Sequence, residues 1–126
     1  CRRGALSLWE QVRAVREGDV VIVCELPSYA VEVTESVEIA HNNGAKVITM
    51  TDSAAAPVCR FAELQLNVSA NSPTFGSSII GPVFLTHVLT SSLAVSLGDD
   101  AKQSFDEQAQ FLHDERIFHP IFGLRY

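Results

Sequence analysis

The run Val20–Cys24, with the sequence VVIVC, constrains the fold more than any other segment of the chain. An unbroken β-branched run of this length is typical of a strand buried on both faces of a parallel sheet. A second such run spans Lys46–Met50, and Leu64–Val68 alternates like a third strand. Helical patterns lie between and after these runs. The sequence therefore predicts a three-layer α/β/α fold with a parallel sheet and right-handed crossovers.

Apolar residues recur at helical spacing in most of the remaining chain. The predicted helical segments are residues 5–16, Val31–Asn43, one turn at Pro57–Ala62, the apolar stretch Phe75–Leu97, and a last helix from Asp99 or Asp100 to about Phe118. Gly18 and Gly44 are placed to end the first two helices. We expect residues 1–98 to form a partial α/β domain, and residues 99–126 to add a C-terminal helix and tail that make oligomer contacts.

The stretch Leu64–Gly98 contains no Asp, Glu, Lys or Arg, and its part Ile79–Leu97 is long enough to span a bilayer. It also contains Gly81, Pro82 and His87 together with several serines and threonines. Helices that are apolar on all sides also occur in the cores of soluble proteins. We therefore expect this helix to lie in a core or in a subunit interface, without membrane contact.

The charge and the cysteine content of the chain indicate which partners and which cellular compartment suit it. The 126 residues carry a net charge of −6, so nucleic-acid phosphates repel the chain. The 3 cysteines are widely spaced and odd in number, which favours a reducing cytoplasm over a disulfide framework. Cys24 and Cys59 are interpreted as small apolar core residues. Of the 4 histidines, His113 and His119 lack metal-ligand spacing with any Cys, Asp or Glu, and we expect no metal and no cofactor.

Ligands on parallel sheets bind beyond the carboxyl ends of the strands, near the point where the strand order changes. Three loops of this chain follow predicted strand ends: Glu25–Ala30, Thr51–Ala56 and Ser69–Ser78. These loops are the expected place of a ligand site.

Several motifs occur in the order and spacing of one known family. They are Gly18–Val23 (GDVVIV), Glu38–Ala40 (EIA), Gly44–Ser53 (GAKVITMTDS), Ala62–Leu66 (AELQL) and Phe75–Ser78 (FGSS). Through these motifs, residues from about 5 to 98 resemble SIS (sugar isomerase) domains, most of all the effector domains of RpiR-type transcription regulators. The resemblance implies a SIS-like sheet with a flavodoxin-like strand order.

The beginning of the SIS domain has no counterpart in these residues. Family members start with a strand and a Gly/Ser-bearing loop ahead of the helix that begins here near Ala5, so we expect the first β-α-β portion to be missing. RpiR-type regulators also carry a helix-turn-helix DNA-binding domain ahead of the sensor. We therefore expect a fragment, an isolated partial sensor or a divergent stand-alone protein, which contacts DNA only through an upstream domain outside this chain.

The loop after the first strand departs from the family pattern. Family members have Ser-x-Ser-Gly-x-Thr there, and its hydroxyl and N–H groups hold a sugar phosphate at the start of the next helix. In this chain Glu25 and Pro27 replace the serines, Ser28 the glycine and Ala30 the threonine. The resemblance therefore implies a changed or lost ligand, since Glu25 brings a negative charge to the phosphate position. Ser28 and Tyr29 keep hydroxyls, and Ser28 is alternatively a helix cap.

The second loop keeps the family's Thr-Asp-Ser start at Thr51, Asp52 and Ser53. Thr51 and Ser53 either touch a ligand or cap the turn before Pro57. Asp52 is expected to anchor the loop rather than to act on a substrate. The candidate ligand-binding residues are therefore Glu25, Ser28, Tyr29, Thr51 and Ser53.

An aldose–ketose isomerase needs a carboxylate or histidine above the sugar carbon, and only Glu25, Glu32 or His87 offers one. We assign no catalytic residue. The predicted function is a non-catalytic SIS-type sensing domain of a transcriptional regulator of sugar metabolism, which binds a phosphosugar or a related carbohydrate as a homo-oligomer. Two alternatives stay open: a sugar-phosphate isomerase of the same fold, and a ligand-free oligomerisation domain.

Overall fold

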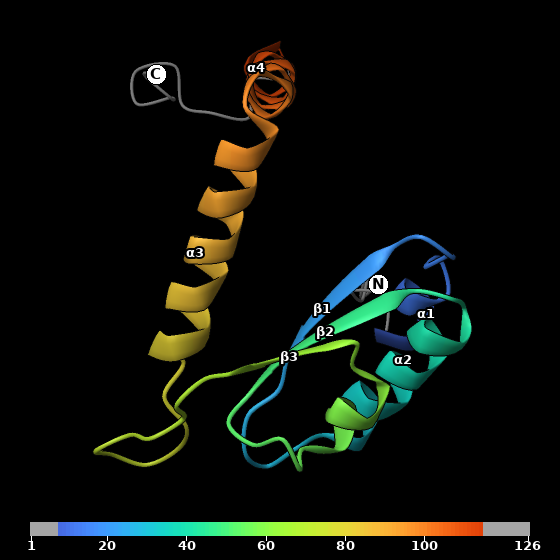
Figure 1. Cartoon of the computed structure of the whole chain (residues 1–126), viewed down its shortest axis with the longest axis vertical. Helices are drawn as coiled ribbons and strands as arrows, with labels where there is room; N and C mark the ends of the chain where they lie inside the picture. The colour runs from blue at the N-terminus through green and yellow to red at the C-terminus, as the bar shows by residue number, and fades with distance from the viewer. Residues whose placement is uncertain (1–7, 115–126) are drawn as a thin grey trace, which may run out of the picture. The chain divides into compact units, whose positions relative to one another are not determined.

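The computed structural model describes residues 8–114, and the side chains of residues 8–111. Its elements are α1 (Leu8–Val12), β1 (Val20–Cys24), α2 (Val31–Asn42), β2 (Lys46–Thr51), the 3-10 helix η1 (Pro57–Phe61), β3 (Leu64–Asn67), α3 (Ile80–Leu97) and α4 (Asp99–Asp114) (Figure 1). The helix predicted over residues 5–16 ends earlier, at Val12, and its predicted start lies outside the described residues. The chain divides into two compact units between Leu85 and Thr86, and each is described by itself.

The three strands form one parallel sheet in the order β1-β2-β3. Val20 of β1 pairs with Lys46 of β2, and Ile48 of β2 pairs with Leu64 of β3. The strands run in the same direction, so their carboxyl ends all lie at one end of the sheet, where the candidate ligand loops follow. This arrangement confirms the predicted α/β fold with a parallel sheet.

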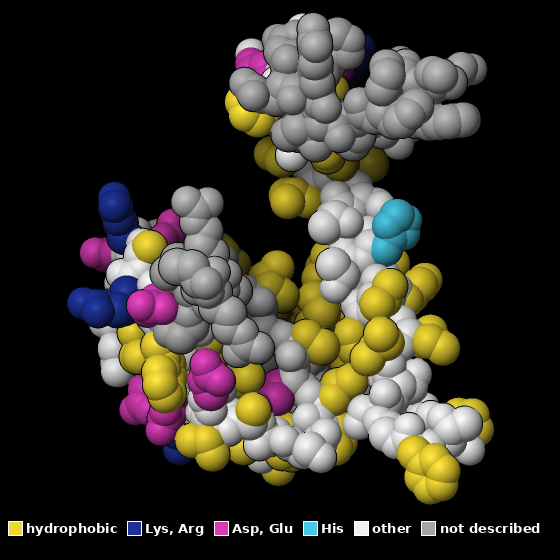
Figure 2. All heavy atoms as spheres, turned by 180° about the vertical axis from the view of Figure 1, so that it is seen from behind, with side chains coloured by type: hydrophobic (Ala, Val, Ile, Leu, Met, Phe, Trp, Pro, Cys, Tyr) yellow, Lys and Arg dark blue, Asp and Glu magenta, His cyan; other side chains and the backbone are white. Residues whose placement is uncertain are grey.

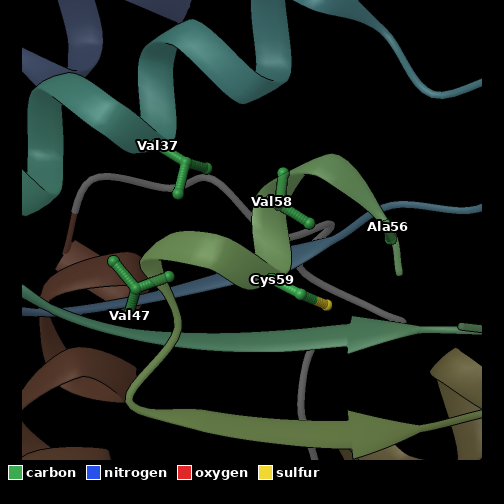
Figure 3. Packing of buried hydrophobic residues seen from close by; sticks show 5 residues of the cluster. All are labelled: Val37, Val47, Ala56, Val58 and Cys59. Atoms are coloured by element: carbon green, nitrogen blue, oxygen red, sulfur yellow. The ribbon is translucent and has the colours of Figure 1, made fainter. Parts of the chain in front are cut away.

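A small apolar cluster fills the space between α2, β2 and η1 (Figure 3). It consists of Val37, Val47, Ala56, Val58 and Cys59. The turn η1 begins at Pro57, where the fixed φ of proline suits a first helical residue. It then directs Val58 and Cys59 into the cluster. Removal of these side chains from water holds α2 and η1 against one face of the sheet.

The opposite face of the sheet is more exposed. Val20 and Ile22 are each 55% exposed, and Leu64 is 49% exposed. Since β1 is an edge strand and the apolar cluster lies on the other face, the prediction that Val20–Cys24 is buried on both faces is wrong for the described structure. Cys24 is exposed as well, so its interpretation as a core residue is also wrong, whereas Cys59 is buried as expected.

The apolar helix α3 begins at Ile80, later than the predicted start at Phe75. Gly76 has a φ of +85°, a left-handed conformation that interrupts a helix. The side chain of Ser78 then accepts a hydrogen bond from the Ile80 N–H at 3.4 Å, as a residue before a helix commonly does. Local turn chemistry therefore delays the helix that the apolar pattern alone predicts.

Large apolar side chains along α3 are exposed, with Val83 at 60% and Phe84 at 68% (Figure 2). The expected burial of α3 in a core is thus not found in the described structure, and its role in a subunit interface stays a prediction. By length and composition, α3 is the one helix within residues 8–114 able to cross a membrane, and a single such helix is weak evidence for a span. Helix α4 begins at Asp99 as predicted, whereas the predicted end at Phe118 lies outside the described residues.

Candidate functional site

The loop after β1 is closed by its own first residue. The Glu25 N–H donates to the Met50 carbonyl at 3.1 Å, so Glu25 extends the pairing of β1 with β2. Its side chain turns back along the loop, and Oε1 accepts a hydrogen bond from the Ala30 N–H at 2.9 Å. Ala30 is the N-cap of α2, and the free N–H groups and dipole at a helix start favour an anion. Glu25 therefore places its own carboxyl group at the start of α2.

The Glu25 side chain is buried at this position. The residue is 5% exposed, and its Oε2 atom has no hydrogen-bond partner among the described atoms. Burial raises the pKa of the Glu25 carboxyl, and the hydrogen bond from Ala30 offsets part of this rise. A buried carboxyl oxygen without a donor is unfavourable, so Oε2 is a point at which an incoming N–H or O–H group would be stabilised.

Ser28 lies at the exposed tip of this loop, with a φ of +84°. A left-handed conformation costs a residue with a Cβ about 1–2 kcal/mol, and a glycine adopts it freely. Ser28 occupies the position where the resembled pattern has glycine, the residue that suits this conformation best. The alternative role of Ser28 as a helix cap is not found, because Ala30 is the N-cap and Glu25 binds its N–H.

Two loops meet through Tyr29 and Asp52. The Tyr29 hydroxyl donates to Asp52 Oδ1 at 2.8 Å, and the Thr51 hydroxyl contacts the same oxygen at 3.4 Å. The hydrogen bond to Asp52 is the largest cause of a raised pKa at the Tyr29 phenol, with further contributions from burial and from the charges of Asp52 and Glu25. The prediction that Asp52 anchors its loop is confirmed, because its carboxylate holds the loop after β2 to the loop after β1.

The candidate residues of the second loop have mainly structural contacts. Thr51 is fully buried, at 0% exposure. Ser53 is half-buried, and its Oγ accepts a hydrogen bond from the Ala55 N–H at 3.2 Å, which forms the turn before Pro57. The structure thus brings Glu25, Tyr29 and Thr51 to one end of the sheet, while Ser53 stabilises its own turn. Contact of any of these residues with a ligand stays a prediction.

The loop after β3, Ser69–Ser78, adjoins the same end of the sheet. The Val68 N–H donates to the Thr51 carbonyl at 3.0 Å, and the Ser78 N–H donates to the Ala70 carbonyl at 2.9 Å. The loop is therefore tied to β2 at its beginning and closed on itself at its end. Most of its hydroxyls make hydrogen bonds within or next to the loop. Ser69 Oγ accepts from the Asn71 N–H, Ser72 Oγ accepts from the Thr74 N–H, and Ser78 Oγ accepts from the Ile80 N–H.

Formal charge in the three loops is entirely negative. They contain two carboxylates, Glu25 and Asp52, and no Lys, Arg or His. Two ion pairs, Lys46–Glu63 and Arg60–Glu38, lie outside these loops. Between residues 8 and 114, no group of three or more metal-ligating side chains gathers. The loops therefore offer hydroxyl and N–H groups to a ligand, but no cationic side chain of their own.

Two contacts of this site were missed by the sequence reasoning. The sequence predicts Glu25 as a charge at the phosphate position, whereas its side chain accepts a hydrogen bond from Ala30 within its own loop. The sequence indicates Tyr29 as a candidate but does not indicate its partner, Asp52, which is 23 residues away. The one signal for the first contact was the position of a long acidic side chain just ahead of a helix start, which commonly carries an anion. No local pattern indicates the second contact.

Comparison with known proteins places this geometry in a family. The family model of the SIS domain matches residues 3–96. Among solved structures, the sugar isomerase domain of the RpiR transcription factor from Sphaerobacter thermophilus aligns with a TM-score of 0.74 and 20% sequence identity, covering 87% of this chain and 62% of that chain. The NanR protein of Vibrio vulnificus, in complex with ManNAc-6P, aligns with a TM-score of 0.69 and 21% identity.

The alignment with NanR covers 85% of this chain and 42% of that chain, so the described fold corresponds to part of each solved protein. No curated protein sequence matches the chain. The two structures share the fold with this chain, and the family model covers most of its length. The chain belongs to the SIS domain family.

Proposed function

We propose that this chain is a non-catalytic, ligand-sensing SIS domain of a transcriptional regulator of sugar metabolism, which binds a phosphosugar or a related carbohydrate. Membership of the SIS family supports a role in sugar recognition. The likeness to an RpiR transcription factor and to NanR, which was solved with ManNAc-6P, supports a sensing role in a soluble, cytoplasmic regulator.

The observation that carries the proposal is the joining of two loops at the carboxyl ends of β1 and β2. Tyr29 and Asp52 hold the loops together at 2.8 Å, directly beyond the strand ends where parallel sheets bind ligands. Glu25 and the hydroxyl groups of the same loops lie within this region. A ligand that binds here contacts both loops at once, so its binding energy acts on their relative position.

The proposed mechanism is a shift in subunit packing. A ligand that binds one arrangement of the loops more tightly than another shifts the population toward that arrangement. The exposed apolar side chains of α3, such as Val83 and Phe84, support a homo-oligomer in which such a shift is passed between subunits. DNA is contacted only through an upstream domain outside this chain.

A ligand-free oligomerisation domain is the second candidate. It is favoured by the Glu25 carboxyl, which already occupies the start of α2 through Ala30. We propose no catalytic group, because Glu25 is tied to the loop backbone, and Glu32 is an exposed residue on the first turn of α2.

Thermal-shift measurement with a panel of sugar phosphates, amino sugars and neutral sugars tests the proposal. We expect at least one sugar to raise the melting temperature, and we expect Tyr29→Phe to reduce this rise. Lys46→Gln is the matched control, since it removes an exposed hydrogen bond to Glu63 at the amino end of β2. A panel without any shift supports the ligand-free candidate, and turnover of an aldose phosphate contradicts the non-catalytic assignment.

A further inference from the structure

We propose that the Glu25 carboxyl stands in the place of a ligand's phosphate, and that the loop after β1 recognises an unphosphorylated sugar or amino sugar through a donor group that reaches Glu25 Oε2. This inference rests on the proposed sensing function and names the class of its ligand. It is carried by the position of the carboxyl group, by the charge of the surrounding loops and by the unpartnered oxygen.

The position of the carboxyl group excludes a second anion. The start of a helix attracts an anion through its free N–H groups, and here Oε1 of Glu25 accepts from the Ala30 N–H at 2.9 Å. The side chain is part of the same loop, so it is present at this position without any loss of translational freedom. A phosphate group would have to displace it and then lie beside it, and like charges at this distance repel.

The surrounding loops do not offset such a charge. Glu25 and Asp52 are the charged residues of the three loops, and both are acidic. The Tyr29 hydroxyl, which could otherwise donate to a phosphate, donates to Asp52 instead. The loops are therefore suited to groups that donate hydrogen bonds, such as sugar hydroxyls and the ammonium group of an amino sugar.

The second carboxyl oxygen supplies the point of recognition. Glu25 is 95% buried, since its exposed fraction is 5%, and Oε2 has no partner among the described atoms. Burial also raises the pKa of this carboxyl, and the hydrogen bond from Ala30 offsets only part of this rise. A ligand O–H or N–H group would donate a hydrogen bond to Oε2 and so stabilise the charged form. Because Oε2 is buried, the atoms that cover it have to move when the donor enters.

The first experiment tests the anion position without any sugar. Thermal unfolding of the wild-type chain, Glu25→Ser and Glu25→Gln is measured in inorganic phosphate and in chloride at equal ionic strength. We expect phosphate to stabilise Glu25→Ser and to shift the Ala30 amide resonance in its NMR spectrum, and to do neither in the wild type. Equal stabilisation of the wild type by phosphate, with the same shift at Ala30, overturns the inference. If Glu25→Ser does not fold, Glu25→Ala replaces it, because it also removes the acceptor of the Ala30 N–H, whereas Glu25→Gln keeps the shape and a carbonyl acceptor for Ala30 and serves as the uncharged control.

The second experiment tests the ligand class by calorimetry with matched pairs, namely ManNAc against ManNAc-6P and glucosamine against glucosamine 6-phosphate. We expect the wild type to bind the unphosphorylated member of a pair about tenfold more tightly or better, and Glu25→Gln to lose most of this preference. Tighter binding of the phosphorylated member overturns the inference and leaves the proposed function standing. Absence of binding by every member overturns both.

Discussion

The hydroxyl of Tyr29 lies 2.8 Å from Oδ1 of Asp52 and donates a hydrogen bond to it, across 23 residues of sequence. Tyr29 belongs to the loop after β1 and Asp52 to the loop after β2. The contact therefore fixes the relative position of two loops that the parallel sheet brings only to the same end. Tyr29 itself is partly buried and packs against the hydrophobic cluster.

Replacement of Tyr29 by Phe removes this hydrogen bond and keeps the ring. We expect a small fall in the free energy of unfolding, since the contact is exposed to solvent, and a larger change in ligand-induced stabilisation. A double-mutant cycle with Asp52→Asn measures the coupling by urea unfolding. If the effects of the two substitutions are additive, the loops are not held by this contact.

Replacement of Ser28 by Gly should stabilise the chain. Ser28 has a φ of +84°, and glycine adopts this conformation without the strain of a Cβ. The relief exceeds the extra freedom that glycine gives the unfolded chain, so we expect a gain of about 0.5–1 kcal/mol in the free energy of unfolding. Ser28→Ala is the control, since it removes the hydroxyl and keeps the Cβ. An equal gain from both substitutions would assign the effect to the hydroxyl instead.

The raised pKa of Glu25 predicts a specific dependence of stability on pH. Burial is its main cause, so the folded chain holds the proton more tightly than the unfolded chain. Between the ordinary carboxyl pKa and the raised value, the folded state binds more protons, and the contribution of Glu25 to the free energy of unfolding falls as pH rises. The stability of the wild type relative to Glu25→Gln should therefore decline through this window and level off above it. Urea unfolding at a series of pH values measures the difference, and a difference that rises with pH contradicts the burial of Glu25.

Much of the fold was predictable because its signals are local. The runs Val20–Cys24 and Lys46–Met50 have the composition of strands in a parallel sheet, and the structure places strands there with few changes at the ends. Local signals do not predict which elements cover the two faces of β1. A β-branched run indicates that its side chains prefer burial, but which element covers each face depends on contacts between residues distant in sequence. In the structure, Val20 and Ile22 are half exposed.

The site was predicted as a set of loops but not as a set of contacts. Loop positions follow from the strand ends, so Glu25, Tyr29 and Thr51 were found by position. The direction of the Glu25 side chain depends on the path of the backbone to Ala30, and that path includes the left-handed residue Ser28. Neither feature has a periodic pattern in the sequence. The sequence therefore indicates only a changed or lost ligand at this loop, whereas the structure shows an internal contact between Glu25 and Ala30 there.

Two glycines with similar conformations should differ in their tolerance of a side chain. Gly44, after α2, has a φ of +88°, and a Cβ there would lie 3.1 Å from Glu17 Cβ and 3.2 Å from Glu17 Cα. Gly18 has a φ of +91° with open space around it. We expect Gly18→Ala to cost about 1 kcal/mol and Gly44→Ala about 2–3 kcal/mol, since only the latter also forces the backbone of Glu17 to move. Equal losses of unfolding free energy for the two variants, measured by chemical unfolding, would show that Glu17 moves away from the new Cβ at residue 44 without a further cost.

The two described cysteines should differ sharply in reactivity. Cys24 is exposed on the open face of the sheet, whereas Cys59 is buried in the apolar cluster beside Thr49, at 3.7 Å from its hydroxyl. Burial of part of the Cys24 side chain raises the pKa of its thiol, so the labelling is best run at mildly alkaline pH, where the thiolate forms. In a Cys1→Ser background, we expect an alkylating reagent to modify Cys24 in the native chain and Cys59 only after unfolding.

The result for Cys24 also decides what covers the sheet. Modification of Cys24 that slows as the protein concentration rises would place this face, with Val20 and Ile22, in a contact between subunits. Protection of Cys24 at every concentration would contradict the exposed face, because a segment of the same chain or a subunit that does not dissociate in this range would then cover it. Mass spectrometry of the labelled peptides separates these results, and Cys24→Ser, which removes the reactive group, identifies the signal. Rapid modification independent of concentration is the outcome that the described structure predicts, because β1 is an edge strand with one face of its side chains open to solvent.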